Sequence, residues 1–580
     1  MEFDPITLKV VWDRLVAICQ DAGATMVRTT FSPVVREGND YCCSLIDTRG
    51  RQLAEPLHTL PSFTGTLPFT VRHFLAKYPG SQLRPGDSIV TNDSWLGTGH
   101  LNDFNVATPV FTSEGNLVAM ASCTAHMTDI GGSINYGATR DVHEEGLRIP
   151  ISKIVRGGNL NTELIELIRF NVRTPDECEG DLTGMLAANA TMANRLLELI
   201  HDENIKDFPA VADEIIRRSE EGMRDAIEKL PAGRYEGSAT FDGAGFPVTI
   251  KVAVEIDGTD VRVDYSGTSP QDNSSSLNVA MNYTYAFTVY PLKLLIYPRL
   301  PTNHGCLRPF SISAPSGSIL NSEWPAAGFC RNYTGHMIHA AIFTALEKVV
   351  PDRIWGHSGS APQGPDGVTG RRENGRPFVQ LFFAGSGGTG AMPAKDGECC
   401  YFPTNARGTS VETTELSAPV LFEEKTLIAD SAGPGKYRGG LGTRWTIRNI
   451  GSDPIMYTGQ VGRMNYPALG LLGGSSGRPN RLFLNDQPEG RGWGRWYLQP
   501  GERLTKESAG GGGLHHPYSR EKESVLMDVL EGYVSVESAR EQYGVVIEDG
   551  QIHGITPGRQ SLQNPGVSAE VRPQRKGVEP

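Results

Sequence analysis

The spacing of apolar residues predicts a helix at the start of the chain and several more along it. Asp4 and Pro5 form a helix start, because a carboxylate caps the first turn and proline suits the first helical position. Apolar residues at helical spacing then continue to about Gly23. The same spacing predicts helices over 183–201, 210–230, 280–296 and 335–350, and two short helices within 524–544, the second capped by Ser535.

Alternating apolar and polar residues predict strands and hairpins between these helices. Tyr41–Ile46 and Leu53–Ala54 flank a turn sequence, and residues 248–256 and 261–265 alternate around another. Most of the chain from there to about residue 510 has the pattern of short strands and glycine-containing loops. We therefore expect an α+β fold, in a large mixed multi-layer protein with short strands, β-hairpins and covering helices.

One stretch, Gly97–Gly132, contains a third predicted hairpin. Apolar runs at 106–111 and 117–123 are joined by Ser113–Asn116, a sequence with turn chemistry. Two antiparallel strands with a tight connection are the natural interpretation.

The register of this hairpin brings four chemically active residues together. It places Asp103 opposite His126 and His100 opposite Asp129. Because opposed residues of an antiparallel pair have Cβ atoms about 5 Å apart, the four side chains should converge at the open end of the hairpin. A one-residue slip at Pro109 would turn Asp129 away.

Length and composition suggest two packed regions and a tail. At 580 residues the chain exceeds the size at which one core usually stops growing. A change of pattern near Pro231–Gly233 divides it into an N-terminal α/β region with the metal site (1–232) and a β-rich region with helices (233–545), packed as one continuous unit. Residues 546–580 are expected to be a loosely ordered tail. The polar segment Arg28–Asp40 has the composition of a surface loop.

Composition also argues against several classes of partner. A net charge of -12 without a basic stripe argues against nucleic acid. No apolar run approaches the roughly 20 residues that span a bilayer, and the N-terminus has no signal pattern, so we expect a cytoplasmic protein without membrane contact. The nine cysteines are scattered without a CxxC pair, which favours reduced thiols.

The convergent residues predict a metal site. Two histidines and one carboxylate, here His100, Asp103 and His126, leave open positions on zinc, manganese or iron. The alternative is that such side chains only hydrogen-bond a glycine-rich backbone. Asp129 suits a fourth ligand or a general base, and we name it with Glu145 as the candidate catalytic residues. Other nearby groups that suit the shell or a base are Asp93, His143 and Glu144.

Other motifs are weaker. Gly385–Gly390 and Gly510–Gly513 resemble phosphate cradles, but neither is followed by the Lys-Ser/Thr of a Walker loop, so tight turns are the better interpretation. His336 and His339 lie one turn apart on a predicted helix without an accompanying carboxylate, which is typical of packing histidines. Sequence alone assigns no role to the remaining candidates, Ser32, Cys123, His515 and His516.

Several motifs resemble those of the hydantoinase B family, the subunit type shared by ATP-dependent N-methylhydantoinases, oxoprolinases and caprolactamases and related to acetone carboxylases. The resemblance covers about residues 4–546. Its motifs are RTTFSPVVREGNDYCCSLID from Arg28, DSWLGTGHLNDFNV from Asp93, AHMTDIGG from Ala125, EEGLRIP from Glu144, GDLTGMLAAN from Gly180, PTNHGCLRP from Pro301, GPGKYRGGLGTR from Gly433, and the GGGG run followed by VLEGYVSVESAREQYGVV.

The resemblance implies a ligand set and shows two departures. The family's metal ligands are the His and Asp of one H-x-x-D motif and the first His of a second, which match His100, Asp103 and His126. A second family histidine is replaced here by Phe63, which leaves only His58 in that segment. The common aromatic-Gly-Asp after the glycine run is Leu514–His516.

The resemblance also implies a division of labour. A hydantoinase A-type partner binds ATP and phosphorylates the oxygen of a cyclic amide such as a lactam, hydantoin or oxoproline. This metal-binding subunit then hydrolyses the activated C–N bond, in a hetero-oligomer such as α2β2. The alternatives are a subunit of an ATP-dependent ketone carboxylase, which would use bicarbonate, and a noncatalytic assembly subunit.

Overall fold

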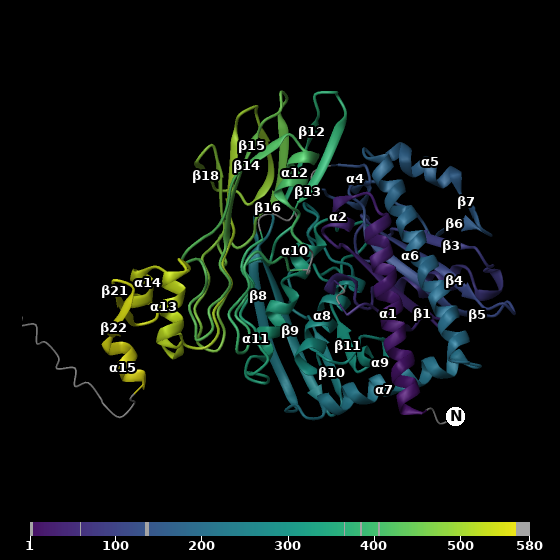
Figure 1. The fold of residues 1–580 in the computed structure, drawn as a ribbon, viewed down its shortest axis with the longest axis horizontal. Helices are drawn as coiled ribbons and strands as arrows, with labels where there is room; N and C mark the ends of the chain where they lie inside the picture. The colour runs from purple at the N-terminus through teal and green to yellow at the C-terminus, as the bar shows by residue number, and fades with distance from the viewer. Residues whose placement is uncertain are drawn as a thin grey trace, which may run out of the picture.

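The computed structural model describes residues 4–563 apart from 58–59, 134–138, 365, 383–385 and 404–406. It combines many helices with several small sheets, which confirms the α+β prediction. Figure 1 shows the N-terminal region at one end, two sheets projecting from the middle, and a small C-terminal unit at the other end. No helix in the described part is long and apolar enough to cross a membrane.

A seven-stranded sheet organises the N-terminal region, in the order β2-β1-β5-β4-β3-β6-β7. All its neighbouring pairs are antiparallel. Its strands are β1 (Tyr41–Asp47), β2 (Gln52–Ala54), β3 (Ser88–Thr91), β4 (Asp103–Phe111), β5 (Leu117–His126), β6 (Ser152–Arg156) and β7 (Asn159–Leu160).

Helices cover both faces of the central strands of this sheet. Helices α1 (Pro5–Thr29) and α6 (Pro175–Asp202) pack on one face, and α3 (Thr66–Lys77) packs on the other. On β1, Cys43 and Leu45 belong to the core under α1, whereas Cys42 and Ile46 belong to the core under α3. Alternate residues are therefore buried on opposite faces, which explains why the strand sequences are nearly continuously apolar. Helix α1 extends about a turn and a half beyond Gly23, where we expected it to end.

The middle of the molecule is a second helix-covered sheet, in the order β11-β10-β9-β8. Helix α11 packs on β8 and β9. The helix predicted over 335–350 is observed as the shorter α11, and a separate short helix, α10, precedes it. Bounds in this layer are α7 (Phe208–Ile227), β8 (Gly233–Asp242), β9 (Pro247–Asp257), β10 (Asp260–Asp264), α8 (Met281–Ile296), α9 (His304–Leu307), β11 (Phe310–Ser313), α10 (Arg331–Gly335) and α11 (Ile338–Leu346).

The projecting part is two sheets packed face to face. One has the order β13-β12-β16-β19 and the other β14-β15-β20-β17-β18. A buried ion pair of 2.9 Å links them, between Lys506 on β20 and Asp366 on β12. Bounds are β12 (Asp366–Arg371), β13 (Pro377–Phe382), β14 (Val420–Leu427), β15 (Thr443–Asn449), β16 (Ile455–Gln460), β17 (Arg481–Leu484), β18 (Gln487–Glu489), β19 (Trp493–Leu498) and β20 (Arg503–Glu507).

Glycine-rich segments connect these sheets to the C-terminal unit, and they run side by side (Figure 1). The Gly510–Gly513 run lies among them: the Gly512 amide donates to the His357 carbonyl at 2.9 Å, and the Gly513 amide donates to the Ser475 carbonyl at 2.9 Å. A Cβ on Gly511 would lie 1.7 Å from the Thr389 carbonyl oxygen. Our prediction of tight turns is therefore wrong for this run, which is a layer of closely packed backbone.

The C-terminal unit has its own small core. It contains α13 (Lys522–Leu530), α14 (Val536–Glu541), β21 (Val545–Glu548), β22 (Gln551–Ile555) and α15 (Pro557–Gln563). Ser535 caps α14 by accepting a hydrogen bond from the Ser538 amide at 3.0 Å, as predicted. The tail that we expected to be loosely ordered from residue 546 instead contributes a hairpin and a helix up to Gln563.

Short elements complete the described structure. Their bounds are α2 (Pro33–Arg36), η1 (Pro61–Phe63), η2 (Gly80–Gln82), α4 (Val142–Glu145), α5 (Thr162–Asn171), α12 (Val411–Ser417) and η3 (Pro517–Ser519). The expected boundary near residue 233 falls at the start of β8, but the largest core cluster contains residues from both sides of it.

The glycine layer leads to a stability prediction. Replacing Gly511 by Ala should lower the free energy of unfolding by at least about 1–3 kcal/mol, because the new methyl group meets fixed backbone rather than a flexible side chain. Denaturant unfolding of the full chain measures this. Gly490→Ala is the matched control, because a Cβ at Gly490 meets nothing within 4 Å and unfolding should be unchanged. Equal stability of the two variants would contradict the packing described.

Candidate metal site

The predicted hairpin register is confirmed. Strands β4 and β5 pair antiparallel, with Asp103 opposite His126 at the open end. The register shift in this hairpin lies near the turn, between Val110 and Phe111, so it does not disturb the site end. His100 lies in the loop before β4, and this loop is anchored where Asn282 donates to the Gly97 carbonyl at 2.7 Å.

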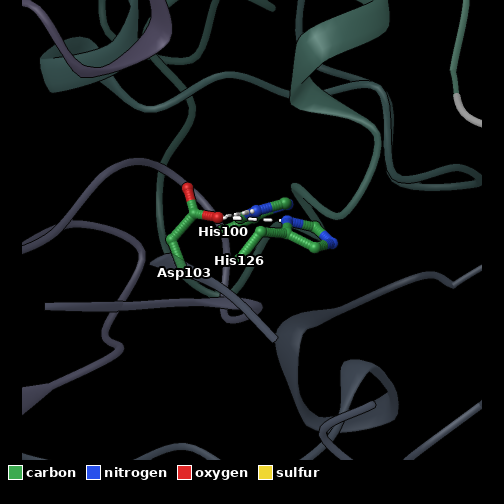
Figure 2. A group of neighbouring side chains, drawn as sticks. All are labelled: His100, Asp103 and His126. Carbon is green, nitrogen blue, oxygen red and sulfur yellow. Dashed lines mark hydrogen bonds and ion pairs between the residues drawn. The ribbon is translucent and has the colours of Figure 1, made fainter. Parts of the chain in front are cut away.

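His100, Asp103 and His126 meet at one point (Figure 2). One carboxylate oxygen of Asp103, Oδ1, lies 2.8 Å from His100 Nε2 and 3.1 Å from His126 Nδ1. The ring centroids of the two histidines are 5.1 Å apart. All three side chains are buried, and Asp103 is only 1% exposed.

The protonation of His100 fits the binding of a cation between these groups. Its Nδ1 lies 3.1 Å from the Phe329 carbonyl, to which it donates a hydrogen bond. Burial and the charge of Arg331 lower the pKa of His100 to about 4, so the ring is neutral near pH 7. Its Nε2 then directs a lone pair at the Asp103 carboxylate. Two facing lone pairs are stabilised by a positive ion between them.

The spacing of the donor atoms also fits a metal ion. Histidine nitrogen and carboxylate oxygen bind such metals at roughly 2.1 Å, so two ligands are about 3.4 Å apart at the tetrahedral angle usual for zinc; at the right angle of octahedral coordination the separation is about 3.0 Å. The two separations at Asp103 Oδ1, 2.8 and 3.1 Å, are close to this value. Imidazole and carboxylate donors suit zinc, manganese or iron.

Arg331 completes the charge balance of the site and was not anticipated from sequence. Its guanidinium forms an ion pair with Oδ2 of Asp103 and donates to the Thr98 carbonyl at 2.6 Å. It also lies 4.1 Å from the centroid of the Tyr283 ring. Gly99 makes this possible, because a Cβ there would lie 2.7 Å from the Arg331 side chain. The sequence around Arg331 has no motif that identifies a partner for the distant Asp103.

The pKa of Asp103 reflects these neighbours. Burial alone would raise it, but the adjacent His100 and Arg331, with a hydrogen bond from His126, hold it well below its usual value. For His126, burial alone would lower the pKa, but the contacts with Asp103 and Asp40 raise it above its usual value. The site is thus organised around a permanently ionised carboxylate.

Asp40 is the second residue that sequence analysis missed. We expected Arg28–Asp40 to be a surface loop, but it contains helix α2, and Asp40 lines the same cavity as the three site residues. Its Oδ2 lies 3.9 Å from His126 Nδ1, and burial raises its pKa to about 6. The pairing of β1 with β5 would have identified Asp40. In that pairing Tyr41 lies opposite Ala125, so the next pair outward is Asp40 and His126.

Asp129 does not join the cluster. Its carboxylate forms an ion pair of 2.7 Å with Arg173 and accepts a hydrogen bond from the Gly131 amide at 3.2 Å. The pairing of β4 with β5 ends at Asp103 and His126, so no ladder holds Asp129 opposite His100. The expected convergence of four residues is therefore a convergence of three.

Glu145 lies behind the site rather than in it. Its carboxylate accepts a hydrogen bond of 2.6 Å from the Phe329 amide, and the carbonyl of Phe329 is the acceptor for His100. Burial raises the pKa of Glu145 to about 8, so it is mostly protonated near pH 7. Since Glu145 does not line the cavity, it can influence His100 only by positioning residue 329.

The remaining candidates lie apart from the cluster. Asp93 is bound by Arg148 at 2.9 Å, Glu144 is bound by Arg140 at 2.9 Å, and His143 packs edge-on against Trp324. Several others have structural contacts: Ser32 caps α2, Cys123 is buried, His336 and His339 pack against aromatic rings, His515 stacks near Tyr437, and His516 caps η3. His58 and Gly385 lie outside the described residues.

The cavity at the cluster measures about 40 Å³. Phe63, which stands where the family usually has a histidine, forms part of its wall. Leu381, Phe402 and Gln460 close it from the second half of the chain. A water needs roughly 10–15 Å³ by this measure, so the cavity has room for an ion and a few waters.

Comparison with known proteins gives consistent matches over nearly the whole chain. The hydantoinase B/oxoprolinase family model matches residues 4–517. One subunit of a putative D-/L-hydantoinase from Pseudomonas sp. (strain NS671) is 29% identical, over 95% of this chain and 96% of that protein. A crystal structure of an ATP-dependent caprolactamase from Pseudomonas jessenii has a TM-score of 0.86 at 28% identity, over 95% of this chain and 98% of that one. Nucleotide-free acetone carboxylase shares the fold, with a TM-score of 0.84 at 19% identity over 96% of this chain and 82% of that one.

Asp103→Asn tests whether the cluster holds a metal. The substitution removes the shared anionic ligand, so the metal content of the purified chain should fall from about one equivalent to near zero. Elemental analysis after desalting measures this, and circular dichroism verifies the fold.

Asp129→Asn is the matched control for this experiment. It disturbs the ion pair with Arg173 but leaves the three site residues intact, so metal content should be unchanged. Loss of metal from Asp129→Asn, together with its retention by Asp103→Asn, would overturn the assignment.

Arg331→Met tests the charge balance. Removing one partner of a buried ion pair typically costs about 3–5 kcal/mol, because the other charge is left uncompensated. The loss of unfolding free energy should be large in chelator-treated protein and smaller with the metal bound, since the ion then offsets Asp103. Arg308→Met, which removes an exposed pair with Glu220, should cost less than about 1 kcal/mol in both states. Equal losses for Arg331→Met with and without metal would contradict this.

Proposed function

Because the chain belongs to the hydantoinase B/oxoprolinase family, we propose that it is the metal-holding subunit of a cytoplasmic ATP-dependent hydrolase of cyclic amides. Its partner is a hydantoinase A-type ATPase subunit that phosphorylates the amide oxygen and so makes the ring carbon a better electrophile. This subunit hydrolyses the activated C–N bond. The relatives named as a hydantoinase subunit and an ATP-dependent caprolactamase support this substrate class.

The observation that carries the proposal is the buried set of His100, Asp103 and His126. Their donor atoms suit a divalent zinc, manganese or iron ion, for the reasons of spacing and protonation given above. Such an ion lowers the pKa of a bound water and stabilises negative charge that develops on a carbonyl oxygen.

The surrounding residues have separate tasks in this proposal. Arg331 keeps Asp103 ionised and fixes its second oxygen, so that Oδ1 stays directed at the histidines. The Phe329 carbonyl holds the Nδ1 proton of His100, which leaves Nε2 free to bind a cation. Asp40 presents a second carboxylate to the cavity beside His126, where it is placed to complete the donor set or to accept a proton.

The Gly510–Gly513 run does not supply an ATP site, which is consistent with binding of ATP by the partner. A phosphate cradle needs backbone amides that face open space. In Gly510–Gly513 the amides of Gly512 and Gly513 are bonded to protein carbonyls, and the Cα of Gly511 faces the Thr389 backbone. This run therefore cannot bind nucleotide phosphates without being pulled apart.

Turnover by the two-subunit complex tests the function. The complex should open hydantoin, lactams or 5-oxoproline only with ATP, with release of phosphate in proportion to ring opening. The complex with Asp103→Asn should retain at most about one hundredth of the rate. Rates unchanged in a metal-free, folded Asp103→Asn complex would favour a noncatalytic assembly role.

Labelled bicarbonate separates the hydrolase from a ketone carboxylase. The complex is incubated with ATP, a ketone and labelled bicarbonate, and acid-stable label in a keto-acid product is measured. We expect none. Stable label in the product, without ring opening of any cyclic amide, would overturn the hydrolase proposal.

A further inference from the structure

A second cavity, of about 90 Å³, lies beside the cavity at the metal site. We call it the aromatic chamber and define it by six of its wall residues: Phe287, Tyr290, His339, Phe343, Trp355 and Tyr401. Helix α8 supplies two of them and α11 supplies another two. The chamber thus lies where the middle layer meets the loops of the glycine-rich part.

The chamber and the metal cavity share three walls. Pro61 lines the chamber, and the next residues of η1, Ser62 and Phe63, line the metal cavity. On α8, Phe287 lines the chamber and Tyr283, one turn earlier, lines the metal cavity, with their ring centroids 4.7 Å apart. Tyr401 lines the chamber, and the next residue, Phe402, lines the metal cavity.

A thin partition of rings separates the two cavities. His336 contacts Phe287 on one side and Phe402 on the other, at 5.7 Å between centroids in each case. The chamber is therefore adjacent to the reaction centre rather than a separate surface feature.

The chamber contains polar groups that have no protein partner. Among the residues that the structure describes, none hydrogen-bonds the hydroxyls of Tyr290 and Tyr401 or the ring of His339. Two fully buried tyrosines outside the chamber are bonded, Tyr265 to Thr288 at 2.6 Å and Tyr333 to the Asp242 carbonyl at 2.8 Å, whereas the hydroxyl of Tyr283 at the metal cavity has no partner among the described residues. Burial raises the pKa of Tyr290 to about 12 and lowers that of His339 to about 4, so these groups are neutral donors and acceptors.

Size and charge limit what the chamber can bind. At roughly 10–15 Å³ for each water, 90 Å³ has room for about six to nine heavy atoms, whereas the metal cavity has room for about three or four. Within the described part of the chain, no charged side chain lines the chamber. The nearby Arg463 is occupied by backbone carbonyls, including that of Ser358. A charged group would be desolvated there without compensation, which is strongly unfavourable.

We propose that the aromatic chamber binds the uncharged ring of the cyclic amide substrate before its amide oxygen is phosphorylated, with the polar edge of the ring on the Tyr290, Tyr401 and His339 groups, and that the ring carbon reaches the metal site afterwards. This inference rests on the proposed function. Unsubstituted lactams and hydantoin have about the right number of heavy atoms. 5-Oxoproline carries a carboxylate that the chamber does not neutralise, so it should be a poor ligand.

The test removes the two hydroxyls without changing the shape of the chamber. In the double variant Tyr290→Phe/Tyr401→Phe, δ-valerolactam and hydantoin should bind about tenfold more weakly to the full chain, by calorimetry, and KM of the two-subunit complex should rise by a similar factor. A site built to hydrogen-bond its ligand loses affinity when those bonds are removed. Metal content and stability should not fall, because neither hydroxyl has a protein partner to lose among the described residues.

Tyr265→Phe is the matched control. It also removes one buried hydroxyl, but one that is bonded to Thr288 on α8, so stability should fall while affinity and KM stay the same. Calorimetry with 5-oxoproline should give at least tenfold weaker binding to the wild-type chain than with δ-valerolactam.

The outcomes separate this inference from the proposed function. Absence of binding by all probes, unchanged affinity in the double variant, or equal binding of 5-oxoproline would overturn the chamber assignment, even if the complex hydrolyses lactams. Weakened binding in the double variant, with no ring opening by any complex, would instead support the chamber and overturn the hydrolase proposal.

Discussion

The site depends on one ionised carboxylate that is buried from bulk solvent. Asp103 is almost fully buried, and its two oxygens are divided between two histidines and an arginine. Such a charge is tolerated only when it is paired and hydrogen-bonded. The hairpin register, the anchored His100 loop and the close approach of Arg331 past Gly99 all serve this requirement.

The three candidate metal ligands lie close together in the sequence, whereas the residues that surround them come from distant parts of the chain. The β4–β5 hairpin supplies Asp103 and His126, and the loop before it supplies His100. Arg331 is the first residue of α10, and Phe329 lies in the segment just before that helix. Residues beyond 380 close the cavity. The sheet therefore positions the metal-binding donor atoms. The ionisation of Asp103 and the access of small molecules to the site depend on segments from later in the chain, which pack against that sheet.

This division explains how far sequence reasoning reached. Turn chemistry between two apolar runs was enough to predict the pairing of Asp103 with His126, because an antiparallel ladder converts sequence distance into spatial position. The prediction for Asp129 failed because the ladder ends at His126, and the carboxylate just beyond it pairs with Arg173 instead. Asp40 needed the pairing of two separate hairpins, β1 with β5, which periodicity cannot reveal.

Arg331 could not have been found at all from local pattern, since its partner lies in another structural layer. The glycine run illustrates a different limit. Its composition is compatible with phosphate binding, turns or close packing, and what decides between them is the backbone of neighbouring segments. Fold class and hairpins followed from local rules, whereas charge pairing and tight backbone contacts depended on tertiary structure.

The late arrival of Arg331 also has a consequence for biosynthesis. The β4–β5 hairpin leaves the ribosome long before residue 331 is synthesised. The nascent N-terminal region therefore contains Asp103 before its ion-pair partner Arg331 exists. Until then the carboxylate must remain hydrated or be neutralised by the two histidines or a cation. The Asp103 carboxylate gains its arginine partner only once the middle layer has emerged.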